Sequence, residues 1–268
     1  MLVTDDAFIR LTVFACVLIL LLVVERYNPS RASDGFFARR WQSNVLIFFA
    51  GILLIKLMGP FIALNAALWS TNQGLGLLNL IALPLAIELV IVLLLLDAAI
   101  YLQHLLSHRI PLLWRFHRVH HSDHEIDVST ALRFHPIEIG FSMLYKCAIV
   151  VSLGASWWAV LIFEILLNAS AMFNHANISL PPRADRFLRS LIVTPEMHLV
   201  HHSRSKAEQN LNFGFFLSLW DRLFNTYRDQ RELESSDNIG LSSASRESAQ
   251  SFLWQISSPF RAGVRRDA

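Results

Sequence analysis

Histidine is concentrated in one part of this 268-residue sequence, at spacings that could build a metal site. All eleven histidines lie in two polar blocks, residues 104–135 and 175–202. Eight of them form three short motifs: His104-x-x-x-His108, His117-x-x-His120-His121 and His198-x-x-His201-His202. Residues three and four apart share one face of a helix, so each motif is predicted to aim its imidazoles at one point.

Eight imidazoles exceed the needs of one ion, since a tetrahedral zinc takes four ligands. The motifs therefore predict two metal ions with open positions, around which the two blocks converge. His175, at the start of the second block, is a candidate ninth ligand. Imidazole suits zinc, copper, iron and nickel. The sequence lacks the Glu-x-x-His of carboxylate di-iron bundles and the His-Glu-x-x-His of zinc proteases.

Three further polar residues bear on this site. Asp97 lies on one helical stripe with Tyr101, His104 and His108, and we expect its carboxylate to accept a ring N–H and fix the tautomer of a ligand. His124 is expected to be a solvated side chain. For His135 the sequence leaves three roles open: a ligand, a partner of a ligand, or the start of a helix.

The composition indicates a membrane protein. Apolar residues make up 54% and charged residues only 16%, whereas soluble domains carry about a quarter charged residues. The net charge of +2 gives no basic field for nucleic acid. The two cysteines lie in apolar runs without a CxxC pattern. Asp5 and Asp6 precede the first apolar run where a signal peptide would be basic, so this run is predicted to be a retained anchor.

Several apolar runs approach the roughly 20 residues that a spanning helix needs. Three are long, and the middle one is expected to kink at Gly59-Pro60. Two shorter runs are predicted to form a tight helical hairpin that turns at Gly154. In chain order the five runs are Phe8 to Val24, Val45 to Trp69, Leu75 to about Leu96, Ile137 to Leu153, and Trp157 to Phe173.

The arginines predict how these helices are oriented. The loop between the first two runs carries Arg26, Arg31, Arg39 and Arg40, whereas residues 70–74 carry no charge. Cytoplasmic loops are enriched in Lys and Arg, so the first loop is predicted to be cytoplasmic. Both histidine blocks then fall on that same face, because the hairpin returns the chain to the side that it left.

We therefore predict an all-α fold, an integral membrane helical bundle of about three long spans plus a hairpin, with a cytoplasmic helical cap that holds a histidine-rich di-metal site. The predicted divisions are residues 1–74 (N-terminal membrane helices), 75–228 (catalytic domain) and 229–268 (a polar, loosely ordered tail with a short helix around Phe252-Leu253-Trp254). Glu88, Glu164 and Asn168 are candidates to line or gate a dry slot that admits a lipid from the bilayer.

Six segments carry a resemblance to a known family. They are HLLSH (104–108), HRVHH (117–121), STALRFHPIE (129–138), NHANI (174–178), TPEMHLVHHS (194–203) and WDRLFNTY (220–227). Over about residues 85–228 the chain resembles the fatty acid hydroxylase and sterol desaturase superfamily of membrane di-iron oxygenases. Where related sequences often have glycine, this chain has Asn225. Asparagine tolerates the left-handed backbone next best to glycine, so little is expected to change.

The resemblance implies two iron ions, O₂ as oxidant, and hydroxylation, desaturation or ether cleavage of a fatty acyl, alkyl or sterol-like lipid. It also implies that metal is bound by His104, His108, His117, His120, His121, His175, His198, His201 and His202. Electrons must come from an external donor, because the sequence has no GxGxxG fingerprint for flavin or NAD.

Two other classes of membrane protein remain as alternatives. A metal transporter predicts ionisable residues spread through several spans, and a bis-histidine haem protein predicts paired histidines inside spans. The histidines of this sequence instead fall beyond the predicted ends of the spans, which favours the oxygenase. The lipid, the carbon attacked and the electron donor are left open by the sequence.

Overall fold

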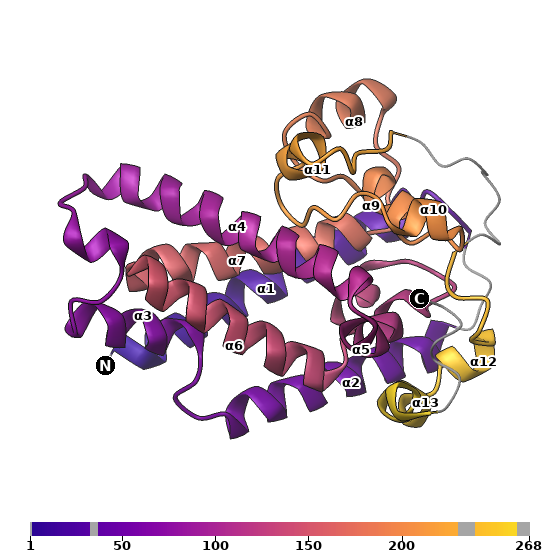
Figure 1. Ribbon diagram of the computed structural model, residues 1–268. Coiled ribbons are helices and arrows are strands. Elements are labelled where there is room, and N and C mark those ends of the chain that lie inside the picture. The colour runs from indigo at the N-terminus through magenta and orange to yellow at the C-terminus, as the bar shows by residue number, and fades with distance from the viewer. Residues whose placement is uncertain (1, 33–36, 230–238, 262–268) are drawn as a thin grey trace.

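The structure, a computed structural model, describes residues 2–32, 37–229 and 239–261. These residues form helices and loops without a β-strand. Long helices lie side by side as an elongated bundle, and short helices gather as a cap at one end (Figure 1). The predicted all-α architecture of a membrane bundle with a helical cap is confirmed.

Five helices of the bundle are long and apolar enough to cross a membrane. The sixth, α3, is short, and it packs against α6 and α7 at the end of the bundle far from the cap (Figure 1). The bundle helices are α1 (Leu2–Tyr27), α2 (Phe37–Leu57), α3 (Ala63–Asn72), α4 (Leu85–Arg109), α6 (Pro136–Leu153) and α7 (Trp157–His175).

Two of the predicted spans have different bounds in the structure. The run Val45 to Trp69 is not one kinked helix, because the chain turns at Gly59, whose φ is +61°, and continues as the separate helix α3. The third span begins at Leu85 rather than Leu75, after the short helix η1 (Leu77–Leu80). It then runs without a break to Arg109, so the span itself carries the first histidine motif.

The predicted hairpin is confirmed. Helices α6 and α7 are joined at Gly154, which has φ +69° and lies so close to Gly76 that a Cβ on Gly76 would be 2.1 Å from the Gly154 nitrogen. Only glycine fits such a close approach of two backbones. The carboxylate of Glu88 accepts a hydrogen bond from the Ser156 N–H at the start of α7, and so ties α4 to the hairpin.

The cap and the adjoining ends of α4 and α7 contain both histidine blocks, and they lie at the end of the bundle where α1 ends and α2 begins (Figure 1). The prediction that the two blocks share one side of the bundle with the arginine-rich loop is thus confirmed. The cap elements are α5 (Pro111–His121), η2 (Val128–Leu132), α8 (Pro182–Leu188), α9 (Pro195–His201), α10 (Lys206–Gln209), α11 (Leu219–Leu223), α12 (Arg246–Ala249), α13 (Phe252–Ser257) and η4 (Ser258–Phe260).

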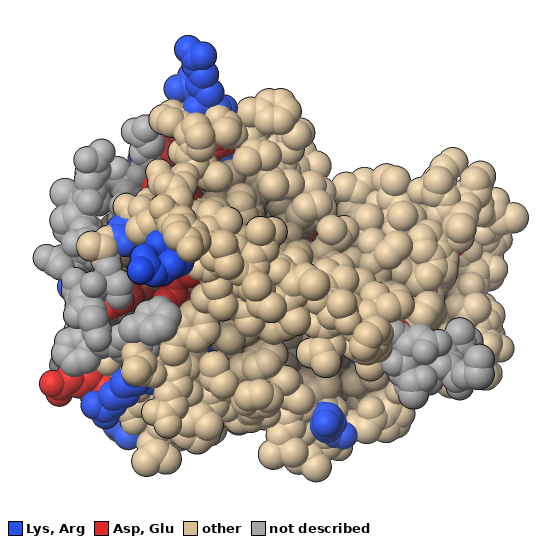
Figure 2. All heavy atoms as spheres, turned by 180° about the vertical axis from the view of Figure 1, so that it is seen from behind, with Lys and Arg blue, Asp and Glu red and all other residues tan. Residues whose placement is uncertain are grey.

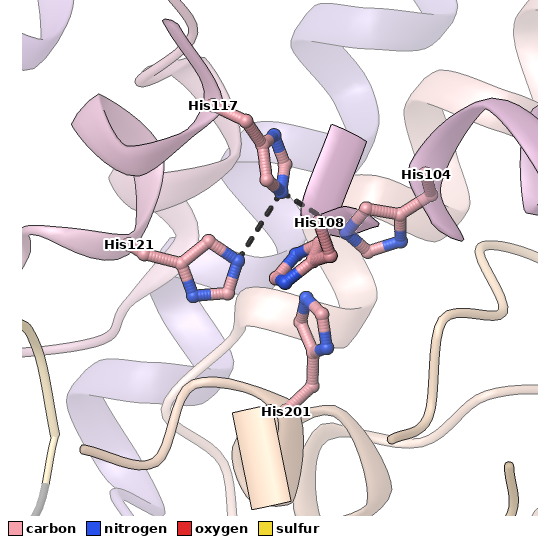
Figure 3. A group of neighbouring side chains, drawn as sticks. All are labelled: His104, His108, His117, His121 and His201. Atoms are coloured by element: carbon pink, nitrogen blue, oxygen red, sulfur yellow. Dashed lines mark hydrogen bonds between the residues drawn. The ribbon is translucent and has the colours of Figure 1, made fainter. Parts of the chain in front are cut away.

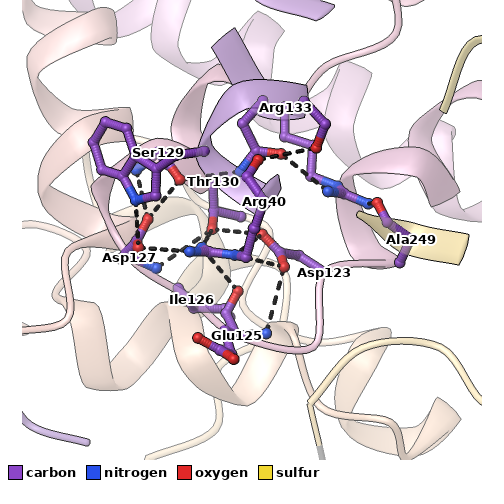
Figure 4. A network of polar contacts seen from close by, with 12 residues as sticks. Arg40, Asp123, Glu125, Ile126, Asp127, Ser129, Thr130, Arg133 and Ala249 are labelled. Atoms are coloured by element: carbon purple, nitrogen blue, oxygen red, sulfur yellow. Dashed lines mark hydrogen bonds and ion pairs between the residues drawn. The ribbon is translucent and has the colours of Figure 1, made fainter. Parts of the chain in front are cut away.

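A buried ionic network ties the cap to α2 (Figure 4). The guanidinium of Arg40 donates to Asp123 Oδ1 at 2.9 Å and to Asp127 Oδ2 at 2.6 Å. Arg133 donates to the Val119 carbonyl and to the side chain of Asn44, a second residue of α2. Buried charges need such partners, so this network fixes α5 and η2 against the membrane helix.

The C-terminal segment is better ordered than the sequence predicts. The short helix around Phe252 is confirmed as α13, but residues 239–261 also pack onto the cap. Gln255 is buried and donates to Ser43 of α2, and the Ala249 carbonyl accepts from Arg133. The predicted loose tail is therefore wrong for residues 239–261, while residues 230–238 and 262–268 lie outside the described residues.

The surface divides in the same way as the fold. Seen from behind, charged side chains gather over the cap, while the surface of the long helices is almost uncharged (Figure 2). Large apolar side chains such as Leu11, Ile19, Phe49 and Leu53 are more than half exposed there. An uncharged belt with exposed leucine and phenylalanine is the surface expected to face hydrocarbon.

Candidate metal centre

The cap and the adjoining helix ends bring nine histidines together in two buried groups. Within each group, one ring nitrogen of every histidine lies within 4.8 Å of those of the others. The five-histidine group consists of His104, His108, His117, His121 and His201 (Figure 3). The four-histidine group consists of His120, His175, His198 and His202. These nine are the residues that the sequence singled out.

Each HxxHH motif contributes to both groups, which corrects the expectation that its three rings meet at one point. In α5, His117 and His121 belong to the five-histidine group and His120 to the other. In α9 and the residue after it the assignment is reversed, since His198 and His202 join the four-histidine group and His201 joins the other. Residues four apart share a face, whereas the neighbouring histidine points about 100° away.

Three rings of the five-histidine group are oriented by acceptors on their outer side. The Nδ1 atoms of His104 and His201 lie 2.7 and 2.8 Å from the carbonyl oxygens of Phe213 and Leu211. His117 Nδ1 lies 2.6 Å from Glu138 Oε1. Carbonyl oxygens only accept hydrogen bonds, so Nδ1 carries the proton in these rings, and Nε2 presents a lone pair to the interior of the group.

This tautomer makes the five-histidine group fit a cation. His104 Nε2 and His117 Nε2 lie 3.1 Å apart, and if both Nδ1 atoms are protonated, two lone pairs face each other at that distance. Two acceptors cannot hydrogen-bond to one another. The Nε2 atoms of His108 and His201 are also buried, and they have no hydrogen-bond partner among the described residues. A bound metal ion would satisfy all of these atoms.

The four-histidine group has the same arrangement around His175. Its Nδ1 donates to the Ala171 carbonyl one helical turn earlier, at 2.6 Å. Its Nε2 lies 3.0, 3.1 and 3.2 Å from the Nε2 atoms of His120, His198 and His202. Phe134 stacks on the ring of His120, with centroids 4.3 Å apart, and so restricts its rotation.

Burial favours the neutral form of five cap histidines. It lowers the pKa of His120, His121, His198 and His202 well below the ordinary value, and neighbouring rings lower it further. Burial also lowers the pKa of His201 to about 3. A buried imidazole avoids the charged form because it has lost its hydration. Neutral imidazole is also the form that binds metal, so the groups are prepared for ligation at neutral pH.

Asp97 does not take the role expected of it. Its Oδ2 accepts from the Trp220 indole and the Leu217 N–H rather than from a histidine ring. Asp97 supports the histidine rings indirectly, through the backbone of a neighbouring loop. Asp221 does the same, because it accepts from the N–H groups of Phe213 and Gly214. Both carboxylates hold the loop of residues 211–217, whose carbonyls orient two of the rings.

Glu138 is the carboxylate that contacts a candidate ligand, and the sequence reasoning assigned it no role. It follows the Pro136 that begins α6, so the first turn of that helix places it beside His117. A carboxylate on the outer nitrogen of a ligating histidine raises its basicity and fixes its ring. A glutamate three residues after His135, in the first turn of the helix that Pro136 begins, is the signal that could have pointed to it.

The two remaining histidines lie outside both groups. His135 caps α6, since its Nδ1 accepts from the Ile137 N–H, and its Nε2 donates to the Ile256 carbonyl. Of its three open roles, the helix start is the one that the structure shows. His124 is half-buried rather than solvated, and its Nε2 donates to the Ala244 carbonyl. Neither residue belongs to a candidate metal group.

Fold and site together define an integral membrane helical protein with a buried, two-part histidine centre that fits metal ions. The sequence model of the fatty acid hydroxylase family matches residues 89–226, which include all nine grouped histidines. The chain belongs to this family. Asn225, inside the matched region, has φ +56°, which confirms the expected left-handed backbone. No solved structure matches the chain.

Curated relatives agree with this assignment. The chain is 30% identical over 184 residues to the ornithine lipid hydroxylase of Rhizobium tropici, which covers 69% of this chain and 54% of that protein. It is 26% identical over 141 residues to human alkylglycerol monooxygenase, and the match covers 51% of this chain and 29% of that protein. It is 28% identical over 144 residues to a cholesterol 25-hydroxylase-like protein of Danio rerio, and the match covers 52% of this chain and 55% of that protein. The chain thus spans about half the length, or less, of these relatives.

Proposed function

We propose that this protein is an O₂-dependent di-iron oxygenase that hydroxylates a C–H bond of a membrane lipid. The observation that carries the proposal is the inward-facing set of Nε2 lone pairs, gathered into two adjacent buried groups at the end of a membrane bundle. Two of the relatives described above are lipid hydroxylases or monooxygenases by name, which supports the same class of substrate.

In this proposal the nine histidines hold two iron ions. The ions supply the activation of O₂, which no side chain can perform. The reaction converts R–H, O₂, two electrons and two protons into R–OH and water. Both electrons come from a redox protein or another external reductant, since the chain has no flavin or nicotinamide motif.

The chain itself contributes orientation and the exclusion of water. Glu138 and the carbonyls of Phe213, Leu211 and Ala171 hold the outer ring nitrogens. The grouped histidines are buried, and this protects a reactive oxidant from side reactions with solvent. His104, His108 and His175 stand near the cap ends of the long helices α4 and α7, so the centre adjoins the helices proposed to cross the membrane.

We further propose that the centre lies at the cytoplasmic face. The arginine-rich loop between α1 and α2 is at the same end of the bundle as the cap, and cytoplasmic loops are enriched in arginine. Labelling of single introduced cysteines with a membrane-impermeant reagent tests this. Labelling in the cap from outside intact cells would contradict the orientation.

One purification tests the class of protein. We expect about two irons per chain, no Soret band, and a hydroxylated lipid that is present in membranes only when the active protein is expressed. The variant His124→Ala is the control, because this histidine belongs to neither group. It should keep the metal content and the lipid product of the unmodified protein. A Soret band would instead indicate haem, and metal binding without any change in the membrane lipids would indicate transport or storage.

A further inference from the structure

A cavity of about 210 Å³ lies between α4, α5 and α6, next to the five-histidine group but outside it. Its walls include Leu106 and Ser107 of α4, Phe116 of α5, and Glu138, Phe141 and Tyr145 of α6. None of the residues that line it is a histidine. The cavity is therefore not part of the metal centre.

The cavity is suited to hydrocarbon. Its apolar wall comes from leucine and phenylalanine, and its hydroxyls already have partners within the protein. Ser107 donates to the Gln103 carbonyl, Ser142 donates to Gln103 Oε1, and Tyr145 donates to the Ala99 carbonyl. A bound water needs two to four polar partners, and a wall whose hydroxyls are satisfied offers few.

The cavity runs along the bundle, from the level of the membrane to the cap. Tyr145 contacts Ala99 and Ser142 contacts Gln103, so moving toward the cap on α4 corresponds to moving toward Glu138 on α6. Beside it, the side chains of Phe141, Leu144 and Leu102 are about half exposed on membrane-spanning helices. Its open side therefore faces the hydrocarbon of the bilayer.

At the cap end the cavity stops at Glu138. One carboxylate oxygen of Glu138 accepts from His117, and the other is buried with no hydrogen-bond partner among the described residues. Leaving a buried acceptor unsatisfied is costly. The free oxygen can accept from an N–H or O–H at the polar end of a lipid, one side chain away from the five-histidine group.

We propose that this cavity binds one acyl or alkyl chain of a bilayer lipid, with the polar end of the chain at Glu138 and the methyl end toward Tyr145. Pockets for drug-sized molecules have volumes of about 300–1,000 Å³, so 210 Å³ accommodates part of a single chain rather than a fused sterol ring system. The identification of this chain as that of the substrate rests on the proposed function. The carbons nearest the headgroup are then the ones beside the metal centre.

Photo-crosslinking in vesicles tests the binding site independently of oxidation. The probe is a phosphatidylcholine with a diazirine on one acyl chain, added to purified metal-free and metal-loaded protein in phosphatidylcholine vesicles. We expect the label on α4 and α6 around residues 103–107 and 141–145. Leu106→Trp fills the cavity and should lower this labelling at least tenfold, while Val90→Trp, at an exposed position of the same helix that does not line the cavity, should not.

Several outcomes would overturn the proposal. They are label spread evenly over the bundle, label at these residues that Leu106→Trp leaves unchanged, or equal labelling there by a sterol diazirine probe. If Leu106→Trp misfolds, Ser142→Phe is a second variant that fills the cavity. The positions labelled in the wild-type protein test the proposed binding site without any variant. If the cavity is labelled but no lipid is ever oxidised, the proposed function fails alone. If lipid is oxidised but the cavity is not labelled, only the present inference fails.

Discussion

The two histidine groups share two elements of the fold, α5 and α9 with the residue after it, but differ in their surroundings. The five-histidine group includes two rings from α4, contacts a carboxylate through Glu138, and lies beside the apolar cavity. The four-histidine group includes one ring from α7, is oriented by the Ala171 carbonyl, and is packed against Phe134. Ions in these groups would therefore be unequal, with the first nearer to a lipid and closer to negative charge.

Removal of a ligand should have the largest effect. His201→Ala takes one ring from the five-histidine group, and His120→Ala takes one from the other. We expect each variant to lose about one metal per chain and more than about 100-fold in activity, since even residues that only support ligands contribute about 10- to 100-fold. Metal analysis and lipid product assays check this. Full metal loading and turnover in both variants would refute the ligand assignment.

Glu138→Gln should affect one group only. The amide keeps the shape of the side chain but removes the negative charge beside His117. We expect metal affinity to fall about 10- to 100-fold at one of the two sites, which two-step metal titration would resolve. Glu88→Gln is the control, because Glu88 contacts the Ser156 N–H at the start of α7 rather than a ring or the loop that orients the rings. Equal weakening of both sites by Glu138→Gln would remove the proposed asymmetry.

The metal-free protein should become less stable in mild acid. Burial lowers the pKa of His201 to about 3 from an ordinary value of 6.5, so below pH 6.5 the unfolded chain binds a proton that the folded chain does not. Stability then falls as the pH is lowered from about 6.5 toward 3. Thermal unfolding of metal-free protein across this range measures the slope. His201→Ala should flatten it, and an unchanged slope would show that other groups dominate.

The smallest effect is expected for His124→Ala. This side chain is half-buried and bonds to the Ala244 carbonyl, outside both groups. Substitutions away from special sites change the free energy of unfolding by about 0.5 kcal/mol or less. This corresponds to about a twofold change, at most, in the ratio of folded to unfolded protein. Loss of a whole metal equivalent in this variant would mean that the two groups do not account for the centre.

The sequence predicts the membrane bundle, the shared side of the histidine blocks and the nine clustered residues, because helical periodicity and long apolar runs are local signals. It does not predict how His120 and His121 divide between the groups, since that depends on where two other helices approach α5. Nor does it separate α2 from α3, because a Gly-Pro pair is compatible with either a kink or a turn. The partners of Glu138 and Asp97 are not predicted either, for the same reason: they lie far away in sequence.

The buried contact between Arg40 and its two aspartates bears on how the protein is assembled. Arg40 lies in a helix that precedes the family match at residue 89, yet its guanidinium neutralises carboxylates next to the second histidine motif. Breaking a buried ion pair costs about 3–5 kcal/mol. The region that matches the family model therefore depends on α2 for part of its stability. A defect at Arg40 would accordingly appear as low yield of mature protein rather than as altered chemistry.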